Sequence, residues 1–222
     1  SRFQHFVAID WSGAVDEFLR GIAVAICSTD GTAPRLIAPP HHRYWSRQAV
    51  LEYLVTELPA NTLVGMDLGI SLPFSDAGAF FPGWAKSPPD ARSLWRLIDE
   101  MCRHDPNLGA NSFIDHPEVS TYFRRHAGRE GAHFNLSTAL HRKGRFRLTE
   151  TAQENAGCKP YSNFNLVGAA QVGKSSLTGM RVLHHMQSRL FVWPVDGLAI
   201  PQTGSVIVEI YTALAAIAAA RR

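Results

Sequence analysis

Three carboxylates occupy similar places in the sequence, each late in a short apolar run. Asp10 ends Phe-Val-Ala-Ile-Asp, Asp67 ends Leu-Val-Gly-Met-Asp, and Glu209 lies late in Val-Ile-Val-Glu-Ile. A charged carboxylate within an apolar strand is costly to bury unless a partner compensates its charge. One such acid is more often a structural residue with a satisfied partner, but three in matching positions indicate a functional site.

These acids are of the type that binds divalent cations. When strands run parallel, their carboxyl ends meet at one edge of the sheet, where sites usually lie. Carboxylate oxygens favour Mg²⁺ or Mn²⁺, and a pair of such ions activates water and stabilises the leaving oxygen during phosphodiester cleavage. We therefore predict that Asp10, Asp67 and Glu209 bind the metal and catalyse hydrolysis, and we leave open whether Glu150 or Asp196 joins them.

A second pattern concerns phosphate binding. Gly168-Ala-Ala-Gln-Val-Gly-Lys-Ser175 matches the phosphate-loop pattern G-x-x-x-x-G-K-[ST]. A working phosphate loop follows a buried strand and opens a helix, whereas the preceding residues 161–167 are polar and few residues remain after Lys174. We interpret the stretch as a Gly-rich entry to a packed helix and expect no ATP. Lys174 remains a candidate phosphate contact.

A basic stretch, His141-Arg-Lys-Gly-Arg-Phe-Arg147, contains two further candidates for contacts with a phosphate backbone, Arg145 and Arg147. A solvated basic face explains the same stretch equally well. Ser12 has no evident base partner, so a serine nucleophile is not predicted. We expect Ser12 to contact substrate together with Arg145, Arg147 and Lys174. The predicted partner is nucleic acid, with DNA and RNA both open.

The elements that would position these residues follow from hydrophobic spacing. Apolar, β-prone runs predict strands, and helical spacing predicts helices. The strands are expected over residues 3–10, 20–28, 35–38, 62–68, 190–193 and 205–210, and the helices over 46–58, 90–103, 175–188 and from 212, with a short one near 117–126. Hairpin-joined strands followed by a helical crossover to a parallel strand indicate an α/β protein with a mixed sheet flanked by helices. Residues 1–222 are expected to form one domain, with a largely helical insertion over about 73–158.

Composition sets the broad class. The chain has 222 residues and a net charge of +3, which permits a polyanionic partner without requiring one. No apolar run approaches the roughly 20 residues of a membrane span, and the N-terminus lacks the build of a signal peptide. Three cysteines without a C-x-x-C pair indicate free thiols in a reducing compartment. We expect a soluble cytoplasmic protein with no membrane partner, and its oligomeric state is open.

Several segments together resemble the family filed as domain of unknown function 429, a predicted RNase H-like nuclease family. The resemblance spans nearly the whole chain through short motifs. They are Asp10-Trp-Ser-Gly13, Gly65-Met-Asp-Leu-Gly-Ile-Ser-Leu-Pro73, Arg147-Leu-Thr-Glu150, Val167-Gly-Ala-Ala-Gln-Val-Gly173, Gly179-Met180 and Val208-Glu-Ile-Tyr211. The family usually has proline after the Glu-x-Tyr step, where this chain has Thr212.

The resemblance implies a ribonuclease H-like fold with a mixed five-stranded sheet, in which a three-stranded antiparallel start is followed by two parallel strands. It places Asp10, Asp67 and Glu209 at the acidic positions of the family. Nuclease activity is itself a prediction for this family, so other functions stay open. One alternative is an actin/sugar-kinase-like or P-loop-like phosphotransferase, and another is a non-catalytic nucleic-acid-binding module of the same fold.

Overall fold

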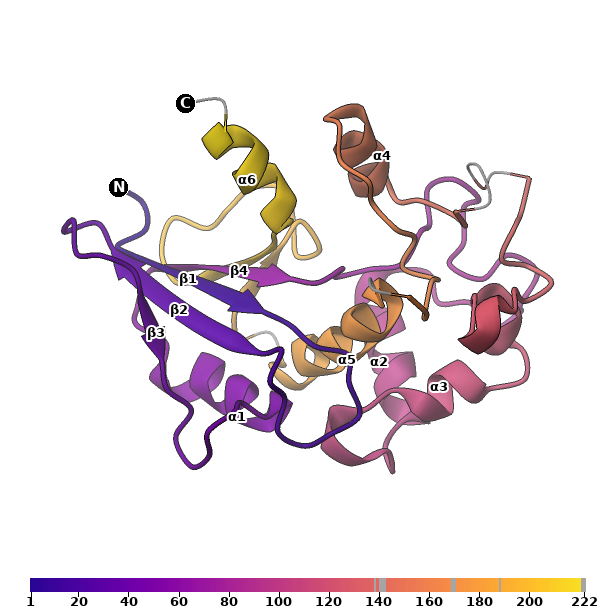
Figure 1. Ribbon diagram of the computed structural model, residues 1–222, viewed down its shortest axis with the longest axis horizontal. Coiled ribbons are helices and arrows are strands. Elements are labelled where there is room, and N and C mark those ends of the chain that lie inside the picture. The colour runs from indigo at the N-terminus through magenta and orange to yellow at the C-terminus, as the bar shows by residue number, and fades with distance from the viewer. Residues whose placement is uncertain (138, 140–142, 169–170, 188, 221–222) are drawn as a thin grey trace.

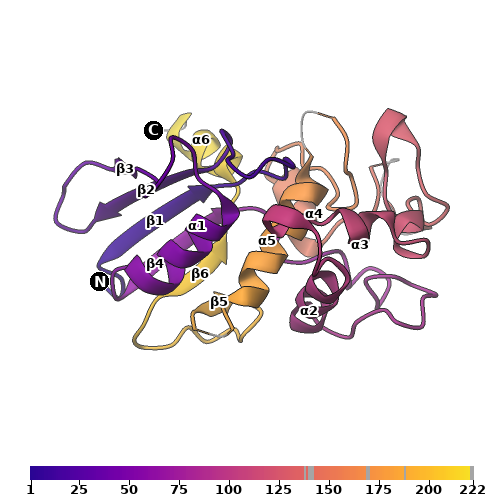
Figure 2. The same ribbon diagram turned by 90° about the horizontal axis from the view of Figure 1, so that it is seen from below.

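The computed structural model contains a six-stranded mixed sheet in the order β3-β2-β1-β4-β6-β5 (Figures 1 and 2). The structure describes residues 1–137, 139, 143–168, 171–187 and 189–220. Strands β1, β2 and β3 pair antiparallel, while β4, β6 and β5 continue the sheet parallel to β1. The strands are β1 His5–Asp10, β2 Ala23–Ser28, β3 Arg35–Ile37, β4 Thr62–Asp67, β5 Phe191–Trp193 and β6 Val206–Glu209.

All six predicted strands are confirmed, but the count of five implied by the family resemblance is wrong for this sheet. The sixth strand is β5, which extends the parallel edge beyond β6. The alternation of side chains in β1 explains how the sheet buries one face: Val7 and Ile9 are buried, whereas Ala8 and Asp10 are exposed. The α/β class with an antiparallel start is therefore confirmed.

Helices cover the two faces of the sheet unequally. Helix α1 (Arg47–Glu52), continued by the π-helical turn Tyr53–Glu57, and helix α5 (Val172–His185) lie against one face, while α6 (Thr212–Ala220) lies on the other (Figures 1 and 2). The side chain of Ser46 accepts a hydrogen bond from the backbone N–H of Ala49, which caps α1 as predicted. None of the helices in the described ranges is long and apolar enough to cross a membrane.

The segment between β4 and α5 lies beyond the ends at which β1 and β4 finish (Figures 1 and 2). Its helices are α2 (Ala91–Met101), α3 (Asn111–Asp115) and α4 (Leu148–Asn155), with short 3₁₀ turns at 106–108, 119–122 and 126–128. Asp90 caps α2 through the N–H of Ser93, close to the predicted start. Much of the segment is irregular, so "largely helical" overstates its regular structure.

The loop after β1 is fastened by Arg47, a side chain of α1 that is only 1% exposed. Its guanidinium donates hydrogen bonds to the carbonyl oxygens of Ser12 (3.0 Å), Ala14 and Asn107 (2.8 Å). Burial, assisted by the charge of Arg181, lowers the pKa of Arg47 to about 10. The loop that follows Asp10 is thereby held to α1 and to the turn at 106–108.

Candidate functional site

Asp10 and Asp67 are the last residues of two neighbouring parallel strands. Strands β1 and β4 pair so that Asp10 lies directly opposite Asp67. Register partners in a sheet project from the same face, so the two carboxylates lie side by side. The structure therefore brings together two of the three acids that the sequence singles out.

Glu209 reaches the same end of the sheet in a different register. In the β4–β6 pair its partner is Met66, one residue before Asp67. Since successive side chains point to opposite faces, Glu209 projects from the face opposite to that of Asp10 and Asp67. The three acids are neighbours at the sheet end, but they do not share a face.

A pocket of about 310 Å³ opens at this end of the sheet. Its lining includes all three predicted acids, and Glu150 joins them, but Asp196 does not. Asp196 instead accepts hydrogen bonds from Arg92 and from the N–H of Val192. Among the described lining residues, four carboxylates face one guanidinium, that of Arg147, so the pocket is strongly acidic.

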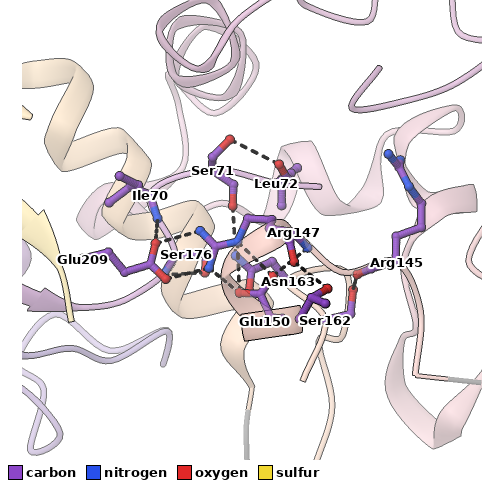
Figure 3. A network of polar contacts seen from close by, with 12 residues as sticks. Ile70, Ser71, Leu72, Arg145, Arg147, Glu150, Ser162, Asn163, Ser176 and Glu209 are labelled. Carbon is purple, nitrogen blue, oxygen red and sulfur yellow. Dashed lines mark hydrogen bonds and ion pairs between the residues drawn. The ribbon is translucent and has the colours of Figure 1, made fainter. Parts of the chain in front are cut away.

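Arg147 joins Glu209 to Glu150 at the centre of a polar network (Figure 3). Its Nη1 and Nη2 donate to the two carboxylate oxygens of Glu209 at 2.7 and 2.6 Å, a bidentate pair. Its Nε lies 3.0 Å from each carboxylate oxygen of Glu150, and Nη2 also donates to Glu150. The N–H of Ile70 donates to Glu209 at 3.1 Å, so three donors hold this carboxylate.

The position of Arg147 at the start of α4 explains why it points into the pocket. The backbone N–H of Arg147 donates to the Glu150 carboxylate at 2.8 Å, which fixes the first turn of α4. The same carboxylate also accepts from the Arg147 guanidinium, so the two side chains lie against each other. Burial alone would lower the pKa of Arg147, but the charges and hydrogen bonds of Glu209 and Glu150 outweigh it and raise the pKa above its usual range. The guanidinium therefore stays charged at every working pH.

Asp67 is a half-buried carboxylate beside other acids. Burial is the main cause that raises the pKa of Asp67. The hydroxyl of Thr212 donates a hydrogen bond to Oδ2 at 3.2 Å and lowers the pKa, whereas the negative charges of Asp10 and Glu209 raise it further. The side chain of Asp67 therefore favours a state in which its charge is neutralised. Either a proton or a cation meets that requirement.

Arg145 lies outside this pocket, contrary to the expectation that it contacts substrate. It is 1% exposed and its guanidinium binds both carboxylate oxygens of Asp76. It also donates to the backbone carbonyls of Pro73, Ala79 and Phe80. With these contacts made, Arg145 fastens the loop 73–80 to the rest of the molecule and does not face a ligand.

Ser12 and Lys174 also lie outside the lining of the acidic pocket. The hydroxyl of Ser12 accepts a hydrogen bond from the N–H of Ala14 at 3.3 Å. Lys174 lines two other hollows, which share Asn111 and Ile114 in their linings. Gly13, the residue after Ser12, packs against the backbone of Lys174 and Ser175. A Cβ added to Gly13 would lie 2.5 Å from the N atom of Ser175. The loop after Asp10 thus packs directly on the backbone of α5.

The phosphate-loop pattern lacks the structural setting of a phosphate loop. Helix α5 begins at Val172, and residues 161–167, which directly precede the pattern, form no strand of the sheet. Asn165 makes an isolated bridge to Arg124, outside the named strands. Parts of two sequence patterns, Ala169-Ala170 of this one and His141-Arg142 of the basic stretch, lie outside the described residues.

The three-carboxylate metal site expected from the sequence does not fit the side chains as they lie. Among the described residues, no group of three or more histidines, cysteines, aspartates and glutamates is arranged to hold a metal ion. Glu209 projects from the opposite face and its two oxygens are bound by Arg147. The pair Asp10 and Asp67 remains as the set of oxygen ligands that points to one place.

The pocket also contains residues that the sequence did not indicate. Gln153 and Tyr211 line it, as does Asn163, which is fully buried. The Nδ2 of Asn163 donates to the carbonyl of Ser71 at 2.9 Å, while its Oδ1 has no hydrogen-bond partner among the described residues. Asn163 lies in a polar, irregular stretch, which carries no periodic signal that would have identified it.

Comparison of the chain with protein-family models, curated proteins and solved structures found no significant match. The family resemblance, and with it the ribonuclease H-like assignment, therefore stays a prediction from the sequence motifs. The fold established by the structure is the mixed α/β sheet with an antiparallel start and parallel continuation.

Proposed function

We propose that the protein is a divalent-cation-dependent hydrolase of phosphodiester bonds that acts on nucleic acid. The observation that carries the proposal is the pairing of Asp10 with Asp67 at the ends of adjacent parallel strands, within a pocket of about 310 Å³. Sites of α/β sheets usually lie at such carboxyl ends. Two aspartates side by side supply the oxygen ligands that Mg²⁺ or Mn²⁺ prefers.

The charge of the pocket supports a requirement for a cation. Four carboxylates and one guanidinium leave it acidic, so a phosphodiester anion is repelled from the bare site. A bound Mg²⁺ or Mn²⁺ supplies the charge that attracts a phosphate oxygen and lowers the pKa of a water molecule. The roles of Asp10 and Asp67 are to hold that cation in place, and the raised pKa of Asp67 is consistent with a pair that lacks a counter-charge.

Aromatic side chains at the rim support nucleic acid as the substrate class. Tyr161, which is 50% exposed, and Tyr211 both line the pocket that contains the acids. Aromatic faces bind nucleobases by stacking, largely independent of base identity. A single-stranded or frayed end would place a base on such a ring and its phosphodiester near Asp10 and Asp67.

The proposal is tested by incubating the purified chain with labelled single- and double-stranded DNA and RNA, with Mn²⁺, with Mg²⁺ or with EDTA. We expect cleavage that needs the cation and falls at least about 100-fold in Asp10→Asn and Asp67→Asn. The control variant Arg35→Ala, at an exposed position of the edge strand β3, should retain activity within about twofold. Bound Mn²⁺ without cleavage of any nucleic acid would support the non-catalytic binding module instead, and absence of Mn²⁺ binding would refute the metal site.

A further inference from the structure

The guanidinium of Arg147 lies where a second cation would have to bind if Glu209 were a metal ligand. Its two terminal nitrogens meet the two oxygens of Glu209 at 2.6 and 2.7 Å in the fork geometry that matches a carboxylate. Oε2 of Glu209 also accepts from the N–H of Ile70, so both of its lone pairs are in use, and a metal ion on Oε1 would lie against the positively charged guanidinium. Arg147 and a second ion therefore compete for one position.

Arg147 is also fixed from its other side. The side chain is 10% exposed, and its Nε lies 3.0 Å from both oxygens of Glu150, which is 3% exposed. Moving the guanidinium away from Glu209 would also separate it from Glu150 and leave that buried carboxylate without its counter-charge. The structure offers Arg147 one place, between these two acids.

We infer that the pocket takes one divalent cation per chain, on Asp10 and Asp67, and that Arg147 occupies the position at Glu209 that a second cation would need. The inference rests on the proposed metal site and sets its stoichiometry. The direction of the Glu209 side chain supports the same assignment. Glu209 projects from the face of the sheet opposite to that of Asp10 and Asp67, so one ion bound to these two aspartates cannot also bind Glu209. With one divalent ion and Arg147, the four carboxylates of the pocket are neutralised to within one charge.

The stoichiometry is measured by titrating the metal-free full chain with Mn²⁺ and following free Mn²⁺ by electron paramagnetic resonance, with calorimetry as a second readout. We expect one ion per chain, a loss of affinity of at least about tenfold in Asp10→Asn and Asp67→Asn, and a change within about threefold in Glu209→Gln. Lys174→Ala removes a cation outside the pocket and should leave both count and affinity unchanged.

Arg147→Met frees Glu209 and should add a second, weaker ion. If this variant fails to fold, Glu209→Gln in the folded chain decides the question, since circular dichroism verifies its structure. Two ions in the wild type, one of them lost in Glu209→Gln, would overturn the inference while leaving the metal site intact. A folded Arg147→Met that still takes one ion would also overturn it, and a wild type that takes none would refute the proposed function itself.

Discussion

Replacing Arg147 with methionine should destabilise the protein strongly at neutral pH, because two carboxylates would lose their counter-charge. The side chains of Glu150 and Glu209 are 3% and 15% exposed. Removing one partner of a buried ion pair costs about 3–5 kcal/mol. For a chain of this size each kcal/mol lowers the melting temperature by about 2–4 °C, so we expect a decrease of about 6–20 °C.

The pH dependence gives the direction of the effect. In the wild type the pKa of Arg147 is raised, so its contribution is fully present below its unfolded value and is lost only in strong alkali. In the variant, two buried carboxylates lose the cation that stabilises their charge, and burial favours the neutral form of an acid without a counter-charge. The folded state then binds more protons, and its stability rises as pH falls. The deficit relative to wild type should therefore shrink between about pH 7 and pH 5.

Thermal unfolding followed by circular dichroism in EDTA, at pH 7.5 and pH 5, measures both effects. The matched control is Arg92→Met, because Arg92 is 37% exposed in its pair with Asp196 and should contribute less than about 1 kcal/mol. A loss in Arg147→Met no larger than that of the control would refute the reasoning. So would a deficit that is equal at the two pH values.

Three further variants test other parts of the structure by the same unfolding assay and by Mn²⁺ titration. Asp67→Asn should increase the free energy of unfolding at pH 7.5 by on the order of 1 kcal/mol, which raises the melting temperature by about 2–4 °C, while it weakens Mn²⁺ binding. The reason is that burial raises the pKa of Asp67, so folding favours the protonated form, and the stability of the wild type falls as the pH rises past the unfolded value of 3.8. A melting temperature of Asp67→Asn below that of the wild type would contradict this. Arg145→Met should lower the free energy of unfolding by about 3–5 kcal/mol, because Asp76 loses this cation. The Mn²⁺ affinity of the folded variant should stay unchanged, and a tenfold weaker affinity would show that Arg145 belongs to the site. Gly13→Ala should cost about 1–3 kcal/mol, since its Cβ would lie 2.5 Å from the N atom of Ser175, and wild-type stability would show that α5 can move.

The strands and the meeting of Asp10 and Asp67 at one end of the sheet could be predicted from the sequence, whereas the face from which Glu209 projects could not. Apolar runs ending in an acid locate β1, β4 and β6 and place their ends at one edge. A shift of one residue in register, however, moves a side chain to the other face. The partner of Glu209 is Met66 rather than Asp67, and nothing in either segment specifies that offset.

The two arginines of the basic stretch show a second limit. Arg145 and Arg147 are two residues apart and equivalent in type, yet one fastens a loop and the other lines the pocket. They differ in the position of their partners: Arg145 binds Asp76 and backbone carbonyls of residues 73–80, whereas Arg147 binds Glu209. Those partners lie more than 60 residues away in the chain, beyond the reach of local spacing.

The loop held by Arg145 has a consequence for how the chain can be shortened or cut. Its irregular backbone and the small or polar residues at its centre, Ser75 to Gly78, are typical of segments that tolerate deletion and proteolysis. Here, however, three backbone carbonyls and Asp76 are acceptors for one buried guanidinium. Excising this loop would remove every acceptor that the buried Arg145 guanidinium has within the described part of the chain, so limited proteolysis should spare residues 73–80. Trimmed versions of the protein should keep this loop even though it contains no helix or strand.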